Sequence, residues 1–371
     1  MTALADVAAA PGRARGGEGA RRRPVGAVRV WLIALAALVV AMVAVGGATR
    51  LTGSGLSITE WRPVTGAVPP LSPEAWEAEF AKYRASPQYE LLNRGMSLEE
   101  FKTIYAWEWG HRQLGRLIGL AFFAPLVWFW RRGLVDRKLA LTLLALGALG
   151  GLQGAVGWIM VASGLEPGMT AVAATKLALH LLLASVILAG LVWMAAGLQA
   201  AAAQSALPQG ARRESFVLIG LILLQIGLGG LVAGSKAGLT YNTWPLMDGA
   251  LSPPVAVLFS QTPWIENVVD NLALVQFNHR LVAYLVVGFA LWHAWRMRRA
   301  APGTSAARRA GGLAGLALTQ AALGVLTLLL VVPLWAALPH QVLAMLLLAL
   351  AVAHARGCAE VRSAPTRPAL G

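Results

Sequence analysis

Charged side chains are scarce in this chain. Asp, Glu, Lys and Arg make up 13% of its 371 residues, about half of the roughly 25% found in soluble domains. Apolar residues account for 57%, yet the net charge is +14. A soluble domain could not keep so much apolar surface away from water, which excludes a soluble nucleic-acid-binding protein despite the basic charge. The composition indicates a polytopic membrane protein.

Cysteine is nearly absent. The single Cys358 excludes an intrachain disulfide and any zinc site built from cysteine pairs. The six histidines are therefore the only strong nitrogen ligands left for a metal or a haem iron.

Long apolar runs are abundant by contrast. A transmembrane helix needs about 20 apolar residues, and eight runs are long enough: 28–48, 107–130, 139–161, 171–197, 215–234, 270–295, 311–332 and 336–355. The first is too long for the core of a signal peptide and lacks a small-residue cleavage site. We therefore predict an all-α membrane protein with eight transmembrane helices.

The basic residues predict the orientation of these helices. If the eight helices alternate, 20 of the 31 Lys and Arg residues fall on one side, with only 5 of the 17 acids. Basic loops stay in the cytoplasm, so both termini are expected there, as a basic arm (1–27) and a tail (357–371). The net charge therefore reflects topology, and we expect no nucleic-acid partner.

The long segment 49–106 is expected on the outer side. Ser72 precedes an amphipathic stretch, 72–86, and Ser97 with Glu100 matches a capping box, so two helix starts are predicted here. We favour a small subdomain that covers the end of the bundle over a surface for docking a partner.

The chain contains an internal repeat. Segment 46–67 aligns with 229–250 at a constant offset, and His111, Gln153, Gly157 and His180 match His279, Gln320, Gly324 and His340. We therefore predict two tandem, pseudo-symmetric four-helix bundles, 28–200 and 201–356. An even number of helices gives both units the same orientation, unlike the inverted repeats of many transporters, which disfavours a haem or cofactor transporter.

Four histidines obey the repeat. His111 and His279 lie on the second helix of each unit, and His180 and His340 on the fourth. All four are about 6 to 16 Å from the outer helix ends at a rise of 1.5 Å per residue. A single intramembrane histidine is usually an interhelical hydrogen-bonding group. Two symmetric pairs instead favour haem ligation, with one haem site in each unit.

The remaining histidines, His293 and His354, each follow a repeat histidine by 14 residues. This spacing stacks two haems in respiratory cytochromes b, but both residues neighbour arginines at cytoplasmic helix ends. We favour an interfacial, snorkelling role for them over ligation.

The two units differ one turn before the second-helix histidine. Glu108 stands three residues before His111, whereas Gln276 precedes His279 by the same spacing, and residues three apart share a helix face. A carboxylate in one unit and an amide in the other predicts a chemical site in the first and a permanent redox site in the second. A simple ion pair between Glu108 and Arg112 is the alternative. Arg112 and Arg280 are candidates for neutralising haem propionates or for anchoring helix ends.

Taken together, these motifs resemble one known family. The stretch GGATRLTGSGLSITEW (46–61), the run Glu108-Trp109-Gly110-His111-Arg112, Asn278-His279-Arg280 and Pro339-His340-Gln341 are similar to the haem A synthase family in its proteobacterial and mitochondrial branch. The resemblance extends from about residue 28 to about residue 356. Other members carry a cysteine pair in an outer loop, which this chain lacks.

The resemblance implies oxidation of the C8 methyl group of haem O to a formyl group, giving haem A for cytochrome c oxidase. By position, His279 and His340 would ligate a haem b cofactor, His111 and His180 would flank or ligate the substrate haem, and Glu108 would assist at the methyl carbon. Two successive oxidations would give a gem-diol that loses water, with electrons leaving through the haem b.

The resemblance also implies a bacterial inner-membrane location. Candidate partners are membrane lipid, an electron acceptor such as a quinone or redox protein, haem O synthase, cytochrome c oxidase assembly factors and a second copy of the chain. The rival function is a di-haem, cytochrome b-type electron carrier. A pure electron carrier gives no reason for the difference between Glu108 and Gln276.

Overall fold

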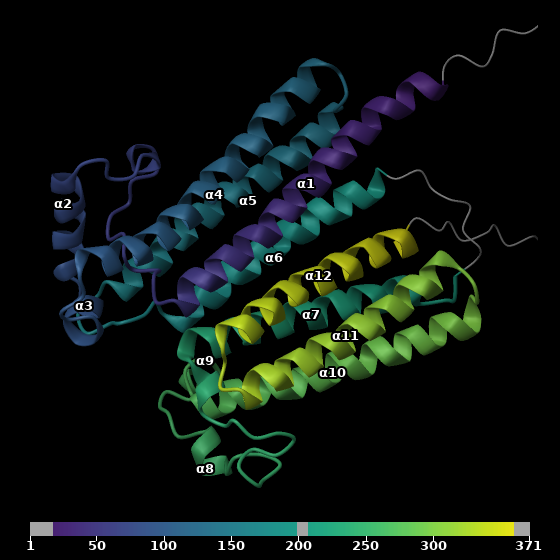
Figure 1. Cartoon of the computed structure of the whole chain (residues 1–371). Helices are drawn as coiled ribbons and strands as arrows, with labels where there is room; N and C mark the ends of the chain where they lie inside the picture. The colour runs from purple at the N-terminus through teal and green to yellow at the C-terminus, as the bar shows by residue number, and fades with distance from the viewer. Residues whose placement is uncertain (1–17, 199–206, 360–371) are drawn as a thin grey trace, which may run out of the picture.

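The computed structural model describes residues 18–198 and 207–359, and these residues form helices and loops without a strand (Figure 1). Eight helices are long and apolar enough to cross a membrane, which confirms the predicted spans. They are α1 (Glu18–Leu51), α4 (Leu98–Arg131), α5 (Arg137–Gly164), α6 (Ala174–Gly197), α7 (Ala211–Ser235), α10 (Leu272–Ala300), α11 (Ser305–Leu329) and α12 (Leu334–Ala359). Most of the predicted arm 1–27 and tail 357–371 lie outside the described residues, as does the predicted boundary between the two units.

The predicted helix starts are confirmed in the outer segment. Ser72 caps α2 (Pro73–Arg84) by accepting a hydrogen bond from the backbone N–H of Ala75. Ser97 and Glu100 form a complete capping box at the start of α4. The helix therefore begins at the predicted cap and contains the predicted apolar run 107–130. The preceding polar turns are helical because the capping box satisfies their free N–H groups and because Phe101 and Tyr105 are buried in an aromatic cluster.

The helices pack in two rings of four. In one ring α1 contacts α4, α4 contacts α5, α5 contacts α6, and α6 contacts α1; α7, α10, α11 and α12 repeat this order. The rings meet where α6 packs against α7 and α12, and where α1 packs against α12 (Figure 1). The largest apolar core runs through this junction and includes Leu32, Leu188, Ile222 and Leu348. The two-fold relation between the units stays a prediction.

The outer segments lie at one end of the helices (Figure 1). The first contains η1 (Thr65–Ala67), α2 and α3 (Pro87–Leu92), and it folds around a small aromatic core of Phe80, Tyr83 and Phe101. The second, after α7, contains η2 (Ala237–Leu239), α8 (Val255–Leu258) and α9 (Glu266–Val269). The first segment packs on the start of α4, so it covers the end of its own bundle and brings residues 57–60 against this helix.

Candidate functional site

Each repeat histidine lies against a glycine of a neighbouring helix. A Cβ atom added at the glycine would come within 2.7 to 3.2 Å of the imidazole ring, closer than the 3.5 to 4.0 Å of good carbon contacts. The four pairs are His111 on Gly46, His180 on Gly157, His279 on Gly229 and His340 on Gly324. The sequence folds this way because only glycine leaves room for a ring on the adjacent helix.

The histidines are also paired within each unit. His111 on α4 and His180 on α6 belong to helices that lie diagonally across the first ring, and His279 on α10 and His340 on α12 lie diagonally across the second. All four rings are half-buried, so they are not sealed inside the protein. The structure therefore brings together the residues that were predicted from the repeat, one pair from α4 and α6 and one pair from α10 and α12.

Three glutamines contact these histidines. The Nε2 atom of Gln153 lies 3.3 Å from His180 Nε2, that of Gln225 lies 3.1 Å from His279 Nδ1, and that of Gln320 lies 3.2 Å from His340 Nδ1. The amide oxygens of all three glutamines are buried without a hydrogen-bond partner in the described part of the chain. The repeat had matched Gln153 with Gln320, whereas Gln225 was missed. The signal was present, because each glutamine stands four residues before its glycine.

These features fit a haem. Paired imidazoles from facing helices are the usual axial ligands of a haem in a four-helix bundle. A ligating histidine needs an acceptor for the proton on its other ring nitrogen. The glutamine atom that faces each ring in this structure is the amide Nε2, a donor, so Oε1 would accept this proton only after the terminal amide turns over. The glycines remove the side chains that would otherwise displace the rings.

Glu108 is held by its surroundings. Its side chain is 3% exposed. Oε2 accepts hydrogen bonds from Ser57 Oγ and from the backbone N–H of Ile58, both at 2.8 Å. Oε1 accepts a bond of 2.6 Å from Arg112 Nη2. The ion pair between Glu108 and Arg112 is therefore present. It forms part of a network that fixes a buried carboxylate one turn from His111.

Gln276 occupies the matching place in the second unit. It is 2% exposed, and its Nε2 donates to the carbonyl of Tyr241 at 3.0 Å. Its Oε1 is buried with no partner among the described residues. The difference between a charged and a neutral side chain is thus preserved in otherwise similar surroundings.

The two arginines hold the outer segments. Arg112 donates to the carbonyls of Ile58 and Glu60, at 2.7 and 2.9 Å. Arg280 donates to the matching carbonyls of Tyr241 and Thr243, at 2.8 and 3.0 Å. The role of these two arginines at haem propionates stays a prediction. In this structure their terminal nitrogens donate to backbone carbonyls. Arg112 also borders a cavity of about 330 Å³ that is lined by further ionic residues, namely Glu60, Arg62, Glu79, Lys82 and Arg116.

The interfacial role expected for His293 and His354 is wrong. Both are fully buried, and their Nε2 atoms are 2.9 Å apart. His293 Nδ1 contacts Glu214 at 2.9 Å, and Glu214 also pairs with Arg296. The Glu214 carboxylate offers a partner to both His293 and Arg296, which offsets the cost of burying these polar side chains inside the bundle. Nitrogens this close leave no room for a second haem between them. Across residues 18–198 and 207–359, no group of three His, Cys, Asp or Glu is arranged to bind a metal ion.

Comparison with known proteins gives consistent matches. A family model for COX15-CtaA, described as cytochrome oxidase assembly protein, matches residues 29–352. A protein of Methylobacterium sp. (strain 4-46) named heme A synthase is 70% identical over 354 residues, which cover 95% of this chain and 97% of the relative. The proteins of the same name from Methylobacterium nodulans and Azorhizobium caulinodans are 70% and 55% identical, covering 86% and 89% of this chain and 89% and 93% of the relatives.

Proposed function

We propose a mechanism from the premise that this chain belongs to the COX15-CtaA family of cytochrome oxidase assembly proteins. It is a multi-pass membrane enzyme of haem A biosynthesis. The proposal is that it oxidises the C8 methyl group of haem O to the formyl group of haem A. The observation that carries the proposal is the difference between two similar sites, one with the buried carboxylate of Glu108 and one with the amide of Gln276.

The C-terminal unit would hold a resident haem b. His279 and His340 are its proposed axial ligands, each on a glycine and beside a glutamine. When bound, the haem supplies reversible one-electron chemistry. In the C-terminal unit the three side chains before His279, namely Gln276, Phe277 and Asn278, are neutral. A site without a carboxylate suits a cofactor that stays bound and only passes electrons.

The N-terminal unit would bind the substrate haem between His111 and His180. The family resemblance suggests two oxidations at the methyl carbon, giving a gem-diol that loses water to the aldehyde. Each oxidation would replace one C–H bond of this carbon by a C–OH bond, with water supplying the oxygen, two protons released and two electrons passed to the acceptor. The Glu108 carboxylate is the proposed base and electrostatic stabiliser. The hydrogen bonds from Ser57, Ile58 and Arg112 hold it in place without a reorganisation of solvent.

The location and partners follow as proposals. We infer that the chain lies in a bacterial inner membrane with both termini in the cytoplasm, because the basic loops fall on one side. The electrons require an acceptor, a quinone or a redox protein. Haem O synthase, cytochrome c oxidase assembly factors and a second copy of the chain remain candidate partners.

The test is pigment analysis after co-expression with a source of haem O. We expect Glu108→Gln to abolish haem A while the purified protein keeps its haem b, and His279→Ala to remove haem b. Glu99→Gln is the control, because this exposed carboxylate lies on the same helix. Unchanged haem A production by Glu108→Gln would refute the catalytic role. Wild-type protein that binds two haems but never converts haem O would favour the electron carrier.

A further inference from the structure

The histidine contacts follow one short pattern. Gln-x-x-x-Gly occurs at 153–157, 225–229 and 320–324, and in each case the glycine seats an imidazole while the glutamine contacts the same imidazole. Residues four apart lie on one face of a helix, so the two contacts come from one surface. The fourth copy, beside His111, reads Met42-x-x-x-Gly46.

We propose that the three glutamines are positioning residues that strengthen haem ligation, and that Met42 leaves His111 as the weak, exchangeable ligand. This inference rests on the proposed function. It assigns a different strength of haem ligation to histidines that occupy equivalent positions in the repeat.

The chemistry of a ligating imidazole supports the glutamine role. Iron takes the lone pair of one ring nitrogen, and the proton on the other then needs an acceptor that orients the ring and raises its basicity. The Nε2 atom of each glutamine lies within 3.3 Å of a ring nitrogen, and its Oε1 is buried without a partner among the described residues, so a turn of the terminal amide would present the oxygen to the ring. In the present orientation Nε2 also donates to the backbone carbonyl of the same histidine, at 2.9 to 3.1 Å, and this bond would be given up when the amide turns.

Met42 cannot do the same. A thioether has no N–H and is only a weak acceptor. Its methyl group lies toward α4, where a Cβ on Gly115 would come within 3.3 Å of it. Within the described residues, no side chain forms a hydrogen bond with the ring of His111.

This difference suits the two tasks. A resident cofactor must stay, and both of its proposed ligands, His279 and His340, contact glutamines. A substrate haem must enter, react and leave. One strong ligand, His180, and one weak ligand, His111, would allow orientation without permanent binding.

The experiment exchanges the two residue types. Gln225→Met and Gln320→Met are expected to weaken haem b retention in the purified protein by about 10- to 100-fold. The midpoint potential of any haem b that remains should become more positive, because the imidazole donates less charge. Leu224→Met and Leu318→Met are matched controls on the exposed face of the same helices and should change neither property.

Three further variants keep the inference testable if the first ones fail to fold. Gln225→Glu supplies a carboxylate acceptor and should keep haem b with a more negative midpoint potential. Met42→Gln should raise the amount of haem O or haem A that co-purifies and slow turnover, whereas Met42→Leu should behave as wild type. Full haem b with an unchanged potential in Gln225→Met, Gln320→Met and Gln225→Glu would overturn the inference. Failure of the proposed function would instead appear as wild-type protein that forms no haem A while these haem b effects persist.

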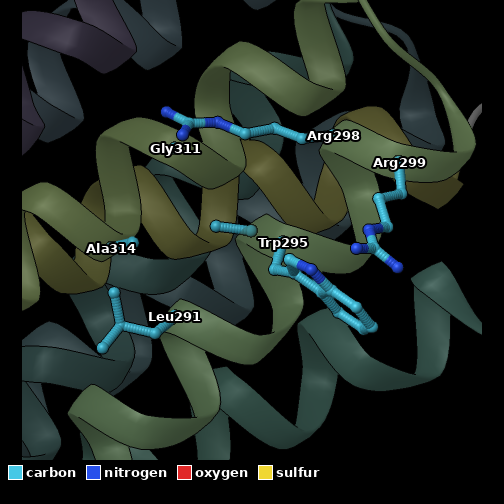
Figure 2. A pocket seen from close by; sticks show the side chains of 7 residues that line it. Leu291, Trp295, Arg298, Arg299, Gly311 and Ala314 are labelled. Atoms are coloured by element: carbon cyan, nitrogen blue, oxygen red, sulfur yellow. The ribbon is translucent and has the colours of Figure 1, made fainter.

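A separate feature lies between α10 and α11, away from the histidines that we assign to haem. A cavity of about 350 Å³ is bordered by Arg298, Arg299 and Trp295 and by the apolar side chains of Leu291, Ala294 and Ala314 (Figure 2). Arg299 stacks on Trp295, with its Cζ atom 4.5 Å from the ring centroid. In the part of the chain that the structure describes, neither guanidinium has a hydrogen bond or an ion pair.

We infer that this groove binds the headgroup of an anionic phospholipid. Guanidinium groups bind phosphate through paired hydrogen bonds, and basic pockets between transmembrane helices take anionic headgroups. Tryptophan marks the membrane–water boundary, and both arginines lie at the end of α10, beside Ala300. Leu291, Ala294 and Ala314 line the same groove with apolar side chains, which an acyl chain can contact.

Native mass spectrometry of the full chain with phosphatidylglycerol or phosphatidylcholine tests this site. We expect at least a ten-fold preference for phosphatidylglycerol that is lost in Arg298→Gln/Arg299→Gln and kept in Arg132→Gln. Arg132 is a matched control, because it stacks on Trp128 at the end of α4, outside this groove. Equal binding of both lipids, or full displacement of phosphatidylglycerol by inorganic phosphate alone, would overturn the inference.

Discussion

Gly324 of α11 lies against the imidazole of His340 of α12, so close that a Cβ atom at this position would be 2.7 Å from Cε1 of the ring. The same relationship recurs at the other three repeat histidines. The position of each of these imidazoles is thus set by a missing side chain on the neighbouring helix as much as by the histidine itself.

We predict that Gly324→Ala displaces His340 and removes haem b. Overpacking of this kind costs about 1 to 3 kcal/mol, and the ring is the group that can move. Haem content and the low-spin optical spectrum of the purified variant measure the effect. Gly315→Ala on the same helix is the control, since nothing lies within 4 Å of a Cβ there. Equal haem loss in both variants would show that helix stability, rather than the ring contact, is responsible.

Ser57→Ala is expected to lower the rate of haem A formation while leaving haem b in place. The substitution removes one of the hydrogen bonds that hold the Glu108 carboxylate. Hydrogen bonds to charged groups contribute about 1.5 to 3 kcal/mol, which corresponds to a loss of about ten-fold or more in rate. Thr103→Ala, an exposed hydroxyl on α4, is the control. A wild-type rate in Ser57→Ala would argue against a positioned carboxylate.

Arg280→Lys should loosen the second outer segment. A lysine cannot reproduce the forked donation to the carbonyls of Tyr241 and Thr243. Limited proteolysis should therefore cut between residues 240 and 270 at least several-fold faster than in wild type. Arg84→Lys, at an exposed ion pair in the first outer segment, should leave this rate unchanged. Similar cleavage rates in both variants would refute the proposal that the Arg280 guanidinium holds the second outer segment.

His354→Ala should destabilise the protein without removing haem b. The change leaves His293 facing an empty space inside the bundle, and an unsatisfied buried polar group costs about 1 to 3 kcal/mol. A lower thermal midpoint with an unchanged haem-to-protein ratio is the expected result. The double variant with His293→Ala should be less destabilised than the sum of the two single changes. Loss of haem on His354→Ala would instead indicate a ligand role for this residue.

Much of this protein follows from sequence alone. The eight spans are confirmed because hydropathy over about 20 residues is a local property that the bilayer imposes. The repeat indicated which histidines to pair, since an intramembrane histidine that recurs in both units is hard to explain by packing. The motifs around Glu108 and His279 also led to the correct family.

Contacts between helices were decided only by the tertiary structure. Position at a helix end suggested that His293 and His354 reach the interface, but the packing of α7, α10 and α12 places Glu214 beside them and makes burial favourable. Gln225 shares the Gln-x-x-x-Gly spacing with Gln153 and Gln320, but its contact with His279 depends on the way α7 packs against α10. The sequence determined which residues enter the membrane, because water and lipid act on each segment separately. The partner of each polar side chain was decided by packing, because a hydrogen bond requires two helices to be placed together.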